Sequence, residues 1–93
     1  MDMEYLQKKR LEVLEEIKPI CEAFKITEYD YIISDTGQRE TLVIYGQRIG
    51  CSCNSMSAIV KELVGYIFLM QWHKESLGPF NTQTRNYIKR YWI

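Results

Sequence analysis

The chain has 93 residues, of which 46% are hydrophobic and 26% are charged, a balance typical of a folded domain and not of a disordered segment. A chain of this length is expected to form one domain over residues 1–93. Twelve acidic and twelve basic residues give a formal net charge of zero, which excludes a polyanion mimic with a strongly acidic surface.

The charges are distributed unevenly along the chain. Residues 1–30 hold eight acidic and five basic side chains (net −3), residues 31–70 hold three of each, and residues 71–93 hold one acidic and four basic (net +3). The longest apolar run, Leu63–Met70, is far shorter than the roughly 20 residues that cross a bilayer. With no apolar signal core near the N-terminus and an odd number of cysteines, we expect a soluble protein of the cytoplasm, without membrane contact.

A helix is predicted from about Asp2 to about Phe24, because apolar residues recur there at a spacing of three or four. Pro19 lies inside this segment and predicts a kink or a break at Lys18. The apolar stripe comprises Met3, Leu6, Val13, Ile17, Ile20 and Phe24, with Arg10 in the vacant position.

Three strands are predicted next, over residues 27–34, 40–45 and 48–53, because these segments are rich in β-branched and aromatic residues. The segment DTGQ favours a type I turn with Gly37 at positive φ. Gly46 is expected at the first central position of a type II′ hairpin turn.

Two further helices are predicted, from about Met56 to about Lys74 and from Thr82 to Trp92. Asn54 or Ser55 supplies the first N-cap, and Asn81 or Thr82 supplies the second. The order α-β-β-β-α-α predicts an α+β fold, with a three-stranded antiparallel meander packed against helices.

Two Gly-Gln-Arg triplets, at residues 37–39 and 46–48, lie in the two hairpin turns. Successive turns of a meander lie at opposite ends of the sheet, about 20 Å apart for a strand of six residues. Arg39 and Arg48 are therefore not expected to grip one small ligand, although they can flank a macromolecular contact.

The strands offer a candidate partner-binding surface. Leu42 and Ile44 are expected to face the core, which places the tyrosines of the strands on the outer face beside the arginines. Tyrosine and arginine are the residues that anchor many protein interfaces. The alternative is that the tyrosines pack under the C-terminal helix. The surface consists of Tyr29, Tyr31, Arg39, Val43, Tyr45 and Arg48.

The helix predicted at Met56–Lys74 is apolar on nearly all sides, and Gly65 at its centre indicates a close approach of another backbone. It is either the central core helix or a helix that is also covered by a partner, such as a second copy in a homodimer.

No catalytic or metal site is expected. Cys51 and Cys53 are spaced one residue too closely for a usual zinc knuckle, and no second pair accompanies them. His73 lies about 30 Å along the helix from these thiols, so a Cys–His catalytic pair with them is not expected, while Cys21 stays unplaced. We therefore expect neither enzyme activity nor a cofactor.

The C-terminal segment interleaves cations with aromatic rings, a pattern that can bind the phosphates and bases of nucleic acid. The candidate residues are Arg85, Lys89, Arg90 and Trp92. The alternative is a helix that docks Ile88 and Trp92 on the core and leaves its cations solvated.

The run YDYIISDTGQRETLVIYGQRIGCSCNS, together with VGYIF, the closing RYWI and the size of the chain, resembles small orphan proteins carried by bacteriophages and prophages. The resemblance covers most of the chain from Ile17 onward. Such proteins often bind and block host machinery, including CRISPR–Cas and other defence complexes. It implies a non-catalytic module that inhibits or modulates a host protein. It assigns a role to no individual residue.

Overall fold

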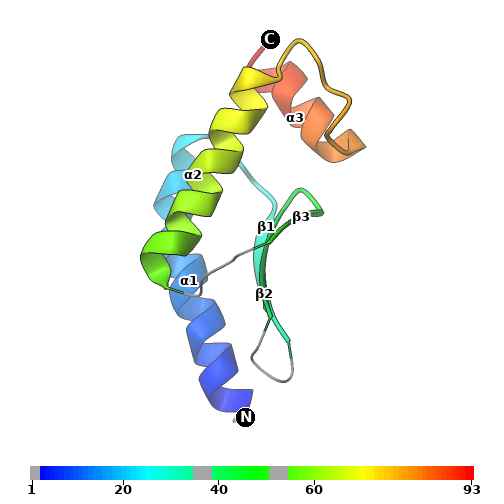
Figure 1. Cartoon of the computed structure of the whole chain (residues 1–93). Helices are drawn as coiled ribbons and strands as arrows, with labels where there is room; N and C mark the ends of the chain where they lie inside the picture. Colours follow the sequence, from blue (N-terminus) through cyan, green and yellow to red (C-terminus); the bar gives the residue numbers. More distant parts are fainter. Residues whose placement is uncertain (1–2, 35–38, 51–54) are drawn as a thin grey trace.

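The computed structural model describes residues 3–34, 39–50 and 55–93. Within these ranges the elements follow the predicted order, which confirms the α+β fold (Figure 1). The helices are α1 (Met3–Ala23), α2 (Met56–Trp72) and α3 (Thr82–Tyr91), and the strands are β1 (Tyr29–Ile33), β2 (Glu40–Ile44) and β3 (Gln47–Gly50).

The strands form an antiparallel meander in the order β1-β2-β3. Ile33 pairs with Glu40 at one end of the first hairpin. Just beyond this pair, the amide of Ser34 donates a 2.9 Å hydrogen bond to the carbonyl of Arg39, and the Arg39 amide donates a 3.1 Å bond to the Ser34 hydroxyl. The predicted type I turn and Gly37 lie outside the described residues.

The second hairpin turn is centred on Tyr45 and Gly46, because Ile44 pairs with Gln47 on either side of them. The φ angles of the two central residues are 50° and 76°, and positive φ at both positions defines a type I′ turn. The predicted type II′ turn, with Gly46 as its first central residue, is therefore wrong by one position. Tyr45 belongs to the turn and not to the strand.

Helix α1 continues without a break through Pro19. Of the kink or break predicted at Lys18, the break is therefore wrong, and the kink stays a prediction. A proline at position 19 removes the amide that would bond the carbonyl of Glu15, and both residues are exposed, so water can satisfy that carbonyl. The residues of α1 that face the core are Leu6, Val13, Ile17 and Cys21.

Helices α1 and α2 lie on one side of the sheet, and α3 lies beyond the sheet end that carries the β2–β3 turn (Figure 1). The core forms between the helices and the inward-facing strand residues, where Leu42 and Ile44 are fully buried, as predicted. Helix α2 contributes Ile59, Leu63, Ile67 and Met70 to this core. No helix within the described ranges combines the length and the hydropathy needed to cross a membrane.

Candidate protein-binding surfaces

The strand tyrosines face the core and α3, so the expected outer tyrosine face is wrong. Tyr31 is fully buried, and the register pairs it with Leu42 on the inner face of the sheet. Tyr29 pairs with Ile44 on the same inner face and is half-buried. The outer neighbour of Val43 on β1 is Asp30 and not a tyrosine.

Tyr45 packs under the C-terminal helix, as the alternative interpretation predicted. Its side chain is 9% exposed, and its ring centroid lies 5.2 Å from that of Tyr87 in α3. Its hydroxyl accepts a 3.0 Å hydrogen bond from the amide of Thr27, and its own amide donates to the carbonyl of Glu28. These contacts hold a bulky residue at a positive φ, which a tyrosine otherwise rarely adopts.

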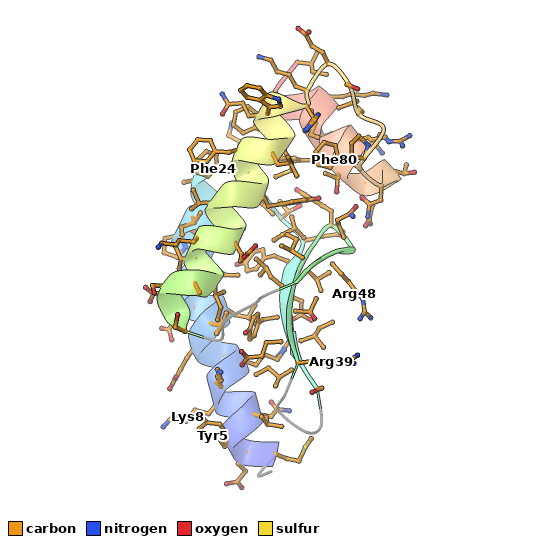
Figure 2. The ribbon with its side chains drawn as sticks, viewed as in Figure 1. Tyr5, Lys8, Phe24, Arg39, Arg48 and Phe80 are labelled. Carbon is orange, nitrogen blue, oxygen red and sulfur yellow. The ribbon has the colours of Figure 1, made fainter. Side chains whose placement is uncertain are left out.

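The outer side of the sheet nevertheless presents a mixed surface to solvent. Val43 lies beside Arg48 of β3 in the cross-strand register, and Ile32 on β1 is 41% exposed. Figure 2 shows Arg39 and Arg48 at the side of the sheet that faces away from the helices. We call this the outer sheet face, defined by Asp30, Ile32, Arg39, Thr41, Val43 and Arg48, where Asp30 is paired with Arg10.

Helix α2 has a second apolar side that the described residues do not cover. Phe68 is 64% exposed, Leu69 43% and Trp72 84%. Gly65 lies one turn before Phe68, is exposed, and has no neighbouring atom within 4 Å of an ideal Cβ position. The close backbone approach predicted at Gly65 therefore does not occur among the described residues. We call Gly65, Phe68, Leu69 and Trp72 the α2 apolar face.

Two of the four candidate nucleic-acid contacts are used inside the chain. The Arg85 guanidinium donates hydrogen bonds of 3.0, 2.7 and 3.2 Å to the carbonyls of Leu77, Phe80 and Gly78 and so holds the loop before α3. The Trp92 ring is half-buried and stacks on Phe24, with centroids 6.2 Å apart. These contacts are those of a docked helix.

Lys89 and Arg90 are exposed and border a groove of about 520 Å³ between α3 and the segment that precedes β1. Tyr91 also lines this groove, and Lys25 lies 5.4 Å from the centroid of its ring. Glu28 places a negative charge on the opposite wall, which weakens the attraction for phosphate. Nucleic-acid binding through α3 stays a prediction, and it rests on Lys89 and Arg90 alone and not on all four candidate residues.

Cys21 lies in the core on α1, where burial raises the pKa of its thiol to about 11. A thiol with this pKa stays protonated near pH 7 and is a poor nucleophile. The His73 ring packs edge-on against Phe80 at a centroid distance of 6.2 Å. No cluster of three or more metal-ligating side chains occurs in residues 3–34, 39–50 and 55–93, and Cys51 and Cys53 lie outside them.

Comparison with known protein families, with curated proteins and with solved structures finds no match to this chain.

Proposed function

We propose that the protein is a non-catalytic binding module, encoded by a phage or another mobile element, that inhibits or modulates a host protein in the host cytoplasm. A defence effector such as a CRISPR–Cas complex is the partner class that the sequence resemblance suggests. The observation that supports binding is the outer sheet face, an open side of the sheet that carries two exposed arginines.

This surface has the chemistry of an interface. Its centre is the partly buried Val43 on the middle strand, with the exposed Ile32 on the neighbouring strand β1. Arg39 and Arg48 supply charged groups that can form bidentate hydrogen bonds with carboxylates. We therefore propose that the partner presents acidic side chains around a small apolar contact.

The proposal is tested with the double variant Arg39→Glu/Arg48→Glu. Both side chains are exposed, so the variant is expected to fold as the wild type does, as circular dichroism can check. Tagged protein is used to capture the partner from host cells, and the captured partner is then purified and titrated directly. We expect the double variant to bind at least about tenfold more weakly than the wild type.

Lys74→Glu is the matched control, because it reverses an exposed charge after α2, away from the outer sheet face. It is expected to bind like the wild type. If the double variant binds the purified partner as tightly as Lys74→Glu does, the outer sheet face is not the binding surface.

A further inference from the structure

The α2 apolar face is comparable in area to the largest apolar patches that monomers expose, and such patches are often binding surfaces. At the exposures given above, Phe68, Leu69 and Trp72 present on the order of 400 Å² of side-chain surface to solvent. A stable interface buries about 800 Å² on each partner. These three side chains alone would supply about half of that area, and the residues around them would supply the rest.

Gly65 gives this face a shape that can receive a side chain from another helix. A glycine in the middle of a helix costs about 1 kcal/mol relative to alanine, and here no described atom of the chain occupies the space beside it. On the helix surface Gly65 lies between Lys61 and Phe68, one turn from each. The result is a shallow depression next to a protruding ring.

The spacing of Lys61, Gly65, Phe68 and Trp72 along α2 allows two copies related by a two-fold axis to pair these residues reciprocally. Lys61 and Gly65 are separated by four positions, as are Phe68 and Trp72. If two α2 helices pack antiparallel, with the axis at the level of the Tyr66–Ile67 peptide bond, Gly65 of each copy faces Phe68 of the other. In the same register Lys61 of each copy faces Trp72 of the other. A two-fold interface requires such reciprocal pairs.

The charges agree with this register. Lys61 is exposed and forms no ion pair with any described residue. An ammonium group over the face of a tryptophan ring is attracted by the ring quadrupole. A parallel pairing would instead place Lys61 against Lys61 and Gly65 against Gly65, which combines repulsion with an empty depression.

We infer that a second copy of this chain covers the α2 apolar face, in an antiparallel helix pair with Phe68 seated on Gly65 and Lys61 against Trp72. This inference goes beyond the proposed function and uses another surface. The core-facing side of α2 points toward the sheet, so the α2 apolar face points away from it. The dimer would therefore leave both outer sheet faces free and would present two binding surfaces to a host partner.

The register is tested by Trp72→Glu and Trp72→Lys, which remove the same ring and differ in charge. Trp72 is highly exposed, so neither change should disturb the fold. Dimer dissociation constants are measured by sedimentation equilibrium at low salt. We expect Trp72→Lys to dissociate at least about tenfold more readily than Trp72→Glu, because Lys61 of the other copy repels lysine and attracts glutamate.

The double variant Lys61→Glu/Trp72→Lys restores opposite charges in the inferred register. We expect the double variant to dimerise at least about tenfold more tightly than Trp72→Lys does. Equal dissociation constants for the two single variants would overturn the inference, as would a wild-type protein that stays monomeric up to about 0.5 mM. A monomer that still binds a host partner through Arg39 and Arg48 would overturn the dimer and leave the proposed function standing.

Discussion

The side-chain amide of Asn81 donates a 2.9 Å hydrogen bond to the backbone carbonyl of Tyr45, a residue 36 positions earlier in the chain. The carbonyl oxygen of the same side chain accepts a 2.9 Å bond from the amide of Thr84 and caps α3. The backbone amide of Asn81 also donates to the Gln47 side chain at 3.3 Å. One residue therefore starts α3 and fastens it to the β2–β3 turn.

Two substitutions at Asn81 separate these roles. Asn81→Asp keeps a capping oxygen and loses the donor to Tyr45, so it is expected to lower the free energy of unfolding by about 1 kcal/mol. Asn81→Ala loses both and is expected to cost about 2 kcal/mol. Urea denaturation measures both values, with Asn86→Ala on the exposed side of α3 as the control. An Asn81→Asp variant as stable as the wild type would show that the bond to Tyr45 contributes nothing.

Two glycines are expected to respond to alanine in opposite directions. Gly46 has a φ of 76°, so Gly46→Ala is expected to destabilise the fold by about 1 kcal/mol through backbone strain. The added Cβ would lie 3.1 Å from the amide oxygen of Gln83, at the end of a flexible side chain that can move.

Gly65→Ala is expected to stabilise the monomer by up to about 1 kcal/mol, because alanine favours a helix and its Cβ would meet open space. Thermal unfolding in the Trp72→Lys background measures this effect without dimer formation. If Gly46→Ala and Gly65→Ala changed stability in the same direction, the conformational roles assigned to the two glycines would be contradicted.

The ion pair between Lys9 and Glu40 is largely buried, since the two side chains are 22% and 5% exposed. The second carboxylate oxygen of Glu40 is buried and has no hydrogen-bond partner in the described structure. Lys9→Met therefore leaves a buried charge uncompensated and is expected to cost about 3 kcal/mol of unfolding free energy.

Arg10→Met is the matched control, because Arg10 and Asp30 form a 2.7 Å pair whose side chains are 38% and 44% exposed. Its expected cost is below about 1 kcal/mol. The double variant Lys9→Met/Glu40→Gln is expected to recover part of the stability lost in Lys9→Met. Equal costs for the two single variants in urea denaturation would show that burial of the Lys9 pair has no special effect.

The buried thiol of Cys21 is expected to make stability depend on alkaline pH. Its pKa rises from an ordinary value of 9.0 to about 11 in the fold, so the unfolded chain loses this proton first as pH increases. The contribution is fully present below pH 9, is lost between about pH 9 and 11, and amounts to roughly 2 to 3 kcal/mol.

The measurement compares unfolding free energies of the wild type and Cys21→Ala at pH 8 and pH 10.5 under reducing conditions. Burial also raises the pKa of Tyr66, which titrates in both proteins and cancels in the comparison. Burial raises the pKa of Tyr87 as well, with a smaller contribution from the Cys21 thiolate, so the comparison reports the Cys21 thiol together with its effect on Tyr87. The variant is expected to lose less stability than the wild type over this range. Parallel losses would show that the Cys21 thiol is not responsible.

Local chemistry predicted the elements well. Ser55 and Asn81 were expected as N-caps among two candidates each, and both accept a hydrogen bond from the amide three residues later. The cap is a contact within one turn, so a short stretch of sequence contains its determinants. The same holds for the inward positions of Leu42 and Ile44 in β2.

The faces of the sheet could not be predicted in the same way, because they depend on register. A shift of one residue in a strand pairing moves every side chain to the opposite face. The register that pairs Tyr31 with Leu42 carries the β1 tyrosines inward, and Tyr45 enters a type I′ turn for which asparagine is usual. Arg85 binds carbonyls of a loop that precedes it, a contact that only the folded chain reveals.

The two tryptophans of the chain lie in opposite environments, and this makes them independent fluorescent reporters. The indole of Trp72 is largely in water, whereas that of Trp92 is half-buried against Phe24. A blue shift of Trp72 emission with rising protein concentration would follow association at α2. In a variant without Trp72, a red shift of the remaining emission would follow the release of α3.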